Sequence, residues 1–296
     1  PLEILMKLTH VLSIDQFDKP LIEELFYHAN WISKAKGHSI SHLRGKLLAN
    51  LFYEASTRTS SSFFAAMSRL GGRVLPINDV TFSSVSKGEI LEDTIRTLAC
   101  YTDIIVLRHP EKGAAQRAAA VSPVPIVNAG DGVGEHPTQA LLDLYTIMAE
   151  QGGIDGLTVT MMGDLKHGRT VHSLARLLRL YDVKINFVSP VELRMPADLV
   201  HPADRQVGTL DEVLTGTDVL YVTRVQKERF EATGDYDYGL TLDHMARAKP
   251  AMSVMHPLPR VNEIPLELDA DPRAAYFRQM QNGLFVRMAL LMYLLG

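Results

Sequence analysis

The chain has 296 residues, enough for about two domains that each bury a core of their own. Its 46% apolar and 22% charged residues are close to globular averages, which excludes disordered and low-complexity proteins. Since 30 lysine and arginine residues stand against 34 acidic ones, the net charge is −4, and no general positive field exists to hold nucleic acid or an anionic membrane.

The single cysteine, Cys100, excludes an internal disulfide and a metal site of several thiolates, and it fits a reducing compartment. The longest uncharged apolar stretch, residues 288–296, has about half of the ~20 residues that a membrane-spanning helix needs. The amino terminus has no signal pattern, so we expect a soluble, cytoplasmic protein with no membrane or nucleic-acid partner. Because the chain starts at Pro1 without a methionine, we also expect a segment of a longer polypeptide.

Short β-branched runs alternate along the chain with longer stretches that carry apolar residues three and four apart. The predicted strands cover residues 47–53, 73–77, 104–107, 126–128, 157–162, 184–188, 219–222 and 253–255. The predicted helices cover residues 20–35, 60–70, 90–101, 138–150, 170–180 and 283–295. This order is typical of βα units around a mainly parallel sheet and predicts an α/β fold.

Two features indicate how this fold is divided. Residues 151–153, Gln-Gly-Gly, interrupt the helical pattern directly after 138–150, and a new strand and helix follow. We therefore place a domain boundary between residues 150 and 151. The last helix is the most apolar, so we expect it to pack across a domain surface.

The first strand ends in hydroxyl residues around one arginine: Ser56, Thr57, Arg58 and Thr59. A strand-to-helix turn directs free backbone N–H groups and the positive end of the helix dipole at one point, while hydroxyls and guanidinium add donors with phosphate-matching geometry. The alternative is that Ser56 or Thr57 only caps the helix, which leaves Arg58 unexplained. The segment therefore predicts a phosphate site.

Two further strands end in candidate site residues. Arg108 follows the run 103–107, at the strand end where open α/β sheets bind ligands, although an ordinary loop charge is an alternative. The run 126–128 leads through a glycine-rich turn to His136 and Gln139, which share one helix face. There an imidazole could polarise a carbonyl, or the histidine could be purely structural. Glu135 occupies the third glycine position of a dinucleotide fingerprint, so that motif is incomplete.

The second half of the chain repeats this arrangement. Residues 163–170 differ from a P-loop by Arg169 in place of lysine, which makes nucleoside-triphosphate binding a rival hypothesis, but no second strand ends in an obvious magnesium-binding aspartate. Arg224 follows the strand 219–222, and a stiff His-Pro-Leu-Pro turn follows 253–255. Several strands that end in arginine or histidine favour one positive crevice over separate loops. By composition alone, residues 83–89 are an ordinary loop.

These motifs, in this order, resemble the carbamoyltransferase family, and the resemblance covers essentially the whole chain. It rests on Ser56-Thr57-Arg58-Thr59, His136-Pro137-Thr138-Gln139, Gly163-Asp164-Leu165 through Arg169, and His256-Pro257-Leu258-Pro259. Within the family the chain is most similar to the aspartate carbamoyltransferases. Residues 166–172 and 271–279 are similar to the version fused into multifunctional pyrimidine-synthesis polypeptides of animals and fungi, which implies fusion to other domains of that pathway.

The resemblance implies the carbamoyltransferase fold, with two doubly wound domains that each hold a mainly parallel sheet. The first, residues 1–150, would bind carbamoyl phosphate and be completed by the C-terminal helix 280–296. The second, residues 151–279, would bind L-aspartate. The resemblance also implies a homotrimer with active sites shared between subunits, and a reaction that uses no cofactor and no metal.

The resemblance assigns roles residue by residue. It assigns carbamoyl phosphate to Ser56, Thr57, Arg58, Thr59, Ser83, Arg108, His136, Gln139, Pro257 and Leu258. It assigns L-aspartate to Lys87, Arg169, Arg224 and Gln226. Catalysis is assigned to Arg58, Thr59, Lys87, Arg108 and His136, and domain closure to the pair of Glu54 and Arg229. Ser83 and Lys87 match a loop that the family inserts from the neighbouring subunit, which replaces the interpretation of an ordinary loop.

The implied reaction transfers the carbamoyl group of carbamoyl phosphate to the amine of L-aspartate, giving N-carbamoyl-L-aspartate and phosphate. Ornithine carbamoyltransferases usually have a cysteine where this chain has Pro257, together with an acidic group for the cationic substrate. Two stretches, 199–208 and 232–240, are shorter than is usual in the family. Two alternatives stay open: another amine acceptor, and a non-catalytic scaffold inside a larger assembly. The arginines favour an anionic acceptor, and a scaffold would not need Arg58, Lys87, His136 and Arg169 together.

Overall fold

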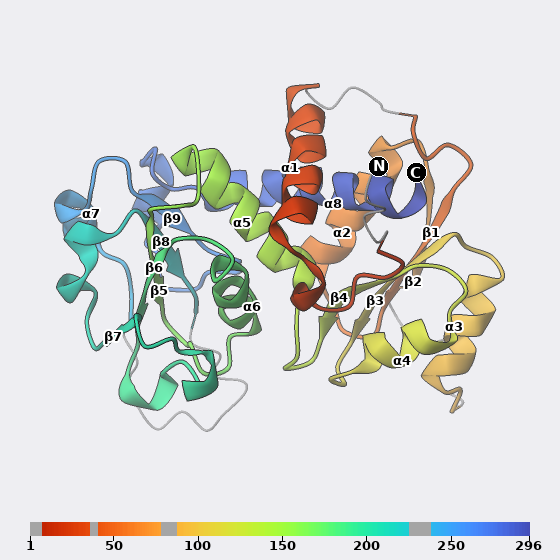
Figure 1. The fold of residues 1–296 in the computed structure, drawn as a ribbon, viewed down its shortest axis with the longest axis horizontal. Coiled ribbons are helices and arrows are strands. Elements are labelled where there is room, and N and C mark those ends of the chain that lie inside the picture. Colours follow the sequence, from red (N-terminus) through yellow and green to blue (C-terminus); the bar gives the residue numbers. More distant parts are fainter. Residues whose placement is uncertain (1–7, 36–40, 78–87, 225–237) are drawn as a thin grey trace, which may run out of the picture. The chain divides into compact units, whose positions relative to one another are not determined.

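The computed structural model describes residues 8–35, 41–77, 88–224 and 238–296. The chain forms two compact units (Figure 1). The first unit consists of Pro1–Thr138 and Asn282–Gly296, and the second consists of Gln139–Gln281. The sequence places its boundary later, between residues 150 and 151.

The first unit is built on a four-stranded sheet of order β2-β1-β3-β4, in which the described strands pair in parallel. Its elements are η1 (Ile14–Gln16), α1 (Lys19–Lys34), β1 (Leu47–Phe52), α2 (Thr57–Arg69), β2 (Arg73–Ile77), α3 (Leu91–Ala99), β3 (Ile104–His109), α4 (Ala114–Val121) and β4 (Ile126–Asp131).

The second unit is built on a five-stranded sheet of order β7-β6-β5-β8-β9, again with parallel pairs. Its helices and strands are α5 (Pro137–Gln151), β5 (Thr158–Met162), α6 (Arg169–Leu178), β6 (Lys184–Val188), β7 (Arg205–Val207), β8 (Val219–Val222), α7 (Leu242–Arg247), β9 (Ser253–Met255) and α8 (Tyr276–Leu295). Its 3₁₀ turns are η4 (Val191–Leu193), η5 (Ala197–Leu199), η6 (Leu210–Glu212), η7 (Leu214–Gly216) and η9 (Leu266–Ala270). Helices α5 and α8 each run across the division between the units.

Both sheets are covered on two faces. In the first sheet, Ala49 and Leu51 of β1 pack into a core with α3 and α4, whereas Asn50 between them donates hydrogen bonds to Ser60 of α2. Successive strand side chains point to opposite faces, so α2 lies on the face opposite α3 and α4. In the second sheet, Leu220 and Val222 of β8 belong to a core with α7, while the intervening tyrosine bonds to α5.

The structure confirms the predicted α/β fold and each of the eight predicted strands, with small changes at their ends. The prediction missed α4, α7 and β7. β7 is three residues long and begins with two exposed polar side chains, so it lacks the apolar alternation of a strand. Helix α8 begins at Tyr276 rather than at 283, because Asn282 and Gly283 resemble a helix boundary but lie inside the helix.

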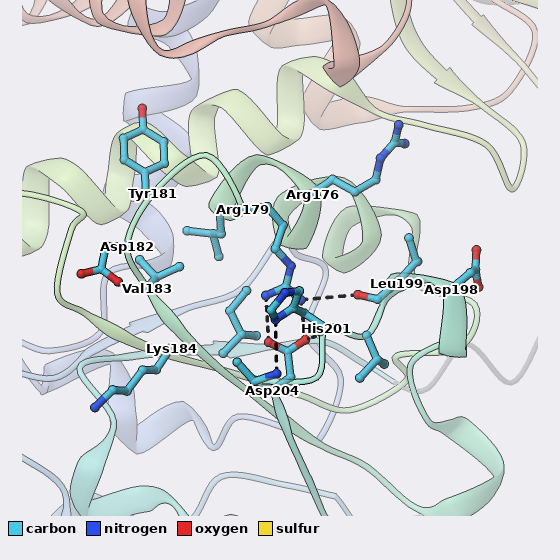
Figure 2. Close-up of a pocket in the computed structure, with 14 residues that line it drawn as sticks. Arg176, Arg179, Tyr181, Asp182, Val183, Lys184, Asp198, Leu199, His201 and Asp204 are labelled. Carbon is cyan, nitrogen blue, oxygen red and sulfur yellow. Dashed lines mark hydrogen bonds and ion pairs between the residues drawn. The ribbon is translucent and has the colours of Figure 1, made fainter.

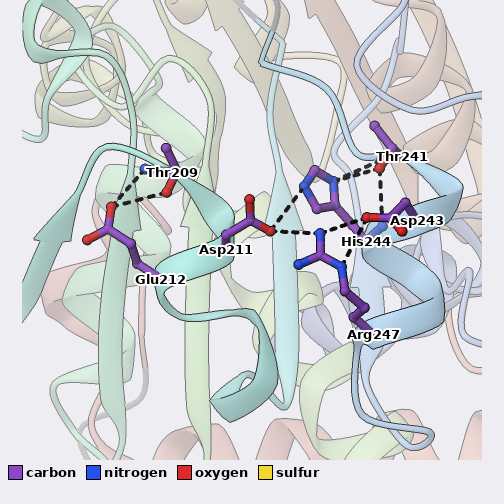
Figure 3. A network of polar contacts seen from close by, with 7 residues as sticks. All are labelled: Thr209, Asp211, Glu212, Thr241, Asp243, His244 and Arg247. Atoms are coloured by element: carbon purple, nitrogen blue, oxygen red, sulfur yellow. Dashed lines mark hydrogen bonds and ion pairs between the residues drawn. The ribbon is translucent and has the colours of Figure 1, made fainter.

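The turn η6 is joined to α7 by a polar network (Figure 3). Arg247 Nη2 lies 2.7 Å from Asp211 Oδ1 and 2.9 Å from Asp243 Oδ2. His244 lies 3.7 Å from the same Asp211 oxygen, and its Nδ1 and backbone N–H also bond Thr241 at the start of α7. These contacts fix the beginning of α7. No helix formed by the described residues is both long and apolar enough to cross a membrane.

Candidate active site

The turn between β1 and α2 carries the predicted phosphate residues of the first unit. Ser56 occupies the N-cap position of α2, but its side chain makes no capping hydrogen bond. Thr57 and Arg58 are exposed in the first helical turn, whereas Thr59 is buried. The Ser56 side chain therefore does not occupy the backbone N–H groups at the start of α2, and these are the groups with which a helix binds an anion.

Arg108 lies beside this turn. It is the last residue but one of β3, where it pairs in register with Phe52, and Tyr53 donates its backbone N–H to the Arg108 carbonyl at 2.9 Å. Because β1 and β3 are neighbours whose connections leave in opposite directions, this is the switch point where open α/β sheets bind ligands. The Arg108 Nε atom lies 3.3 Å from Glu54 Oε2.

His136 lies directly before α5 and is 4% exposed. Its Nε2 atom is 3.4 Å from Thr59 Oγ1, so the first turn of α2 and the β4–α5 turn meet here. Asp131 shapes the latter turn by accepting the backbone N–H groups of Glu135 and Gly113. Within the first unit, Thr59, Arg108 and His136 therefore come from adjacent strand ends, as the sequence predicts.

Glu135, which breaks the dinucleotide fingerprint, has a structural role. Its carboxylate accepts hydrogen bonds from the Ser13 hydroxyl at 2.8 Å and the Ile14 backbone N–H at 2.9 Å. Glycine at that position could make neither bond. The residue fixes η1 against the β4–α5 turn, immediately before His136.

The second unit has its own switch point between β5 and β8. Gly163 directly follows β5 and has φ 124°, and a side chain there would collide with the carbonyl of Thr223, the residue directly after β8. Arg169 is the first residue of α6 and is 8% exposed, and Arg224 follows Thr223. The two arginines thus lie in the segments that follow two neighbouring parallel strands, β5 and β8, at the carboxyl edge of the sheet.

A third turn follows β9. His256 Nδ1 accepts the backbone N–H of Leu258 at 2.8 Å, and its Nε2 lies 2.7 Å from Glu263 Oε1. Since Nδ1 accepts, the proton is on Nε2, which donates to the carboxylate. Leu258 has φ 57°, which is uncommon for a residue other than glycine, and the Leu258–Pro259 bond is cis.

Burial of Glu263 raises the pKa of its carboxyl, but the hydrogen bonds from His256 and from backbone N–H groups outweigh this and hold the pKa below its usual 4.5. The buried pair thereby fixes the backbone of Pro257 and Leu258.

Asp143 of α5 is a polar residue at the centre of the second unit that the sequence did not single out. Its carboxylate is fully buried and accepts hydrogen bonds from Gln139 Nε2 at 2.9 Å, Gln279 Nε2 at 2.6 Å and Tyr221 Oη at 2.8 Å. Gln279 also accepts the His256 backbone N–H at 2.9 Å. A lone acidic residue among apolar ones, four positions after Gln139, was the available signal.

Four predicted site residues lie outside the described residues: Ser83, Lys87, Gln226 and Arg229. Their roles and the predicted pairing of Glu54 with Arg229 stay predictions. Among the residues that the structure does describe, no group of three or more His, Cys, Asp and Glu side chains is placed to hold a metal ion.

A separate pocket of about 580 Å³ lies at the other edge of the second sheet, where β6 and β7 begin (Figure 2). Arg179 crosses it and donates to Asp204 Oδ1 at 2.8 Å and to the Leu199 carbonyl at 3.4 Å. Asp204 also accepts the His201 backbone N–H at 2.7 Å. The charged groups in the middle of this pocket are thus bonded to one another, whereas the predicted site arginines lie at the opposite strand ends.

Family models match both parts of the chain. The carbamoyl-P binding domain of the aspartate/ornithine carbamoyltransferases matches residues 9–149, and the Asp/Orn binding domain of the same family matches residues 155–294.

Named relatives agree with this match. The multifunctional protein CAD of Squalus acanthias is 53% identical over 97% of this chain, and the chain spans 13% of its length. The aspartate carbamoyltransferase catalytic subunit of Thermoplasma acidophilum is 48% identical, and the match covers 99% of this chain and all of that subunit.

The fold agrees as well. Aspartate transcarbamoylase from Trypanosoma cruzi, solved in complex with carbamoyl aspartate and phosphate, superposes with a TM-score of 0.91. It is 46% identical, and the match covers 97% of this chain and 96% of that one. The chain therefore belongs to the aspartate/ornithine carbamoyltransferase family and has its two-domain α/β fold.

Proposed function

We propose that the chain transfers the carbamoyl group of carbamoyl phosphate to the amine of L-aspartate, giving N-carbamoyl-L-aspartate and phosphate in de novo pyrimidine biosynthesis. The observation that carries the proposal is the placement of Arg169 and Arg224 in the segments that follow the neighbouring strands β5 and β8 of the second unit. Two guanidinium groups suit an acceptor with two carboxylates, whereas the cationic side chain of ornithine would be repelled.

Carbamoyl phosphate is assigned to the residues around the β1–α2 turn. Its phosphate would be held by Ser56, Thr57 and Arg58, together with the start of α2 and Arg108. The uncapped helix start supports this assignment. The assigned domains are residues 1–150 with the C-terminal helix 280–296 for carbamoyl phosphate, and 151–279 for aspartate.

The reaction needs stabilisation of a charged intermediate rather than a covalent nucleophile. The neutral amine of aspartate attacks the carbamoyl carbon, and the carbonyl oxygen becomes negative. Thr59, Arg108 and His136 would donate hydrogen bonds to that oxygen, in the manner of an oxyanion hole. The close approach of Thr59 and His136 supports this shared role.

Collapse of the intermediate breaks the bond between the carbamoyl carbon and the phosphate oxygen. The departing phosphate takes the proton that the amine loses, so the atoms balance without a further base. Gln139 would hold the carbamoyl amine, and the Pro257–Leu258 backbone would complete the carbamoyl phosphate site. Fixed groups that hold both substrates supply an entropic share of the acceleration.

The remaining assignments concern assembly. Ser83 and Lys87 would act across a subunit interface of a homotrimer, Gln226 would bind aspartate, and Glu54 with Arg229 would hold the closed form. The chain matches only 13% of the length of the CAD relative, which supports a proposed place within a longer cytoplasmic polypeptide that carries other steps of the pathway.

The test measures carbamoyl product from carbamoyl phosphate, with L-aspartate and L-ornithine as parallel acceptors. Product with aspartate alone is expected. Arg58→Ala should abolish turnover without unfolding the protein, whereas Arg69→Ala, an exposed arginine in the last turn of the same helix, should not change it. Product with ornithine, or no product from an assembled trimer, would overturn the proposal in favour of another acceptor or a scaffold. Normal activity of Arg58→Ala would remove the phosphate assignment.

A further inference from the structure

Asp143 is fully buried in α5 and is surrounded by hydrogen-bond donors. Its Oδ1 atom accepts from Gln139 Nε2 and from Gln279 Nε2, and its Oδ2 atom accepts from the Tyr221 hydroxyl. Burial and the neighbouring carboxylate raise the pKa of Tyr221 well above its usual value, so the phenol keeps its proton and can donate. Three donors around one carboxylate match an ionised acid.

An ionised carboxylate can only accept hydrogen bonds, whereas a glutamine amide has a donating and an accepting end. Each glutamine beside Asp143 must therefore turn its nitrogen toward the carboxylate. Gln279 shows the consequence, because its Nε2 donates to Asp143 and its Oε1 accepts the backbone N–H of His256. By the same rule, Gln139 keeps Oε1 at the end of its amide that is away from Asp143.

We infer that Asp143 is a specificity-determining positioning residue, which fixes the Gln139 amide so that its oxygen accepts a hydrogen bond from the amino group of the carbamoyl donor. The inference rests on the proposed function and on the assignment of the carbamoyl amine to Gln139. The amino group of the donor would then be the feature by which the site distinguishes carbamoyl phosphate from acyl phosphates of the same size.

Acetyl phosphate is the matched competitor, since it carries a methyl group where carbamoyl phosphate carries an amino group. A methyl group cannot donate to Oε1, and its binding would leave a buried acceptor without a partner. If the amide of Gln139 could turn over, an N–H group would replace the oxygen and the advantage of the amino group would disappear. Asp143 prevents this turn because a second acceptor facing its carboxylate would be repelled.

The experiment compares Asp143→Asn with the unchanged protein. It measures kcat/KM for carbamoyl phosphate and the inhibition constant of acetyl phosphate as a competitor. The neutral amide of the variant can donate as well as accept, so either orientation of Gln139 becomes possible. The preference for carbamoyl over acetyl phosphate should fall about three- to tenfold, the equivalent of one hydrogen bond between neutral groups.

Thr160→Val is the matched control. Thr160 is a fully buried polar residue of β5 in the same unit, with its hydroxyl 2.7 Å from Thr217 Oγ1 and 3.1 Å from Asn186 Nδ2. Loss of the Thr160 hydroxyl should destabilise the second unit but leave the preference for carbamoyl over acetyl phosphate unchanged. A fall in the ratio as large as that of Asp143→Asn would mean that general loosening is the cause, and the inference would be wrong.

A double variant that exchanges the amide and the carboxylate between positions 139 and 143, called the swap below, tests the same point and keeps one buried carboxylate. In Gln139→Glu with Asp143→Asn, the asparagine amide donates to the new carboxylate, whose oxygens all accept, so the preference for the amino group should return to the original ratio. The swap also replaces the single variant if Asp143→Asn does not fold. A folded swap that lacks the preference, or a folded Asp143→Asn that keeps it, overturns the role of Asp143. If the unchanged protein makes no carbamoyl aspartate, the proposed function itself fails, and that failure is distinct from these outcomes.

Discussion

Glu263 is a buried carboxylate that accepts hydrogen bonds from three donors around the turn at residues 256–259. It accepts the Nε2 proton of His256 on one oxygen and the backbone N–H groups of Val261 and Asn262 on the other. Because both oxygens accept, an amide in the same place would put its nitrogen against a donor. The charge on this residue therefore has a structural purpose.

We predict that Glu263→Gln lowers the free energy of unfolding at pH 7 by about 1–3 kcal/mol, the usual cost of a buried donor without an acceptor. Glu267→Gln, an exposed glutamate in the following 3₁₀ turn, should change it little. Urea denaturation of the two variants measures the difference. Equal stability of the two would show that the carboxylate is not needed.

The same residue predicts a pH dependence. The pKa of Glu263 in the folded protein lies below its usual 4.5, so its contribution to stability is complete above about pH 4.5. It is lost as the pH falls through the lower folded pKa, where the carboxylate takes up a proton. The stability difference between the unchanged protein and Glu263→Gln should shrink in that acidic window. A difference that grows on acidification would contradict the assignment.

At the scale of elements, α8 holds two arginines in opposite environments. Arg287 is 4% exposed, donates to the Ser62 hydroxyl at 2.9 Å, and has its guanidinium 5.2 Å from the centre of the Phe63 ring. Arg278 forms two hydrogen bonds to the carboxylate of Glu150, but its side chain is 45% exposed. The first pair joins α8 to α2, and the second joins α8 to α5.

We predict that Arg287→Ala lowers the free energy of unfolding by about 2 kcal/mol or more, because a charge-assisted hydrogen bond and a cation–π contact are lost from a buried place. Arg278→Ala should cost less than about 1 kcal/mol, since solvent screens its ion pair. Thermal and urea unfolding of both variants measure the order. The reverse order would show that surface pairing, not the buried contact with α2, holds the helix.

At the scale of the whole molecule, the two units place site residues by the same rule. Each has a parallel sheet with a switch point, between β1 and β3 in one and between β5 and β8 in the other. The arginines assigned to the two substrates follow those strands. One rule of topology thus explains why the residues assigned to the two ligands are spread along the chain.

The proposed shared site of the trimer gives a prediction by complementation. Lys87→Ala and Arg58→Ala chains should each be inactive. Random mixed trimers should regain about a quarter of the sites, because a site that takes Arg58 from one chain and Lys87 from its neighbour is then intact in one arrangement of four. Activity after mixing, with trimer mass recorded on the same sample, measures this. Verified mixed trimers without activity would mean that each site lies within one chain.

Much of the fold, and the placement of the candidate site residues in the first unit, was predictable because the signals are local. Alternating β-branched runs mark strands, and the residues after them must lie at the carboxyl edge of a parallel sheet. Arg58, Thr59, Arg108 and His136 were predicted in this way, and the contact of Thr59 with His136 confirms that two of their turns meet. α4 was missed because it is only eight residues long and five of these are alanine, so it has few large apolar side chains to mark a buried face.

The sequence by itself determined the strands, the turn chemistry and the family, since these depend on residues a few positions apart. Only the tertiary structure decided which distant groups meet: Gln279 reaches Asp143 from 136 residues away, and Glu135 reaches Ser13 from 122 residues away. Such pairs have no periodicity in the sequence, because they form only after strand order and helix packing have brought their elements together. The direction in which Gln139 turns its amide belongs to this second class, since the buried carboxylate and its other two donors decide it together.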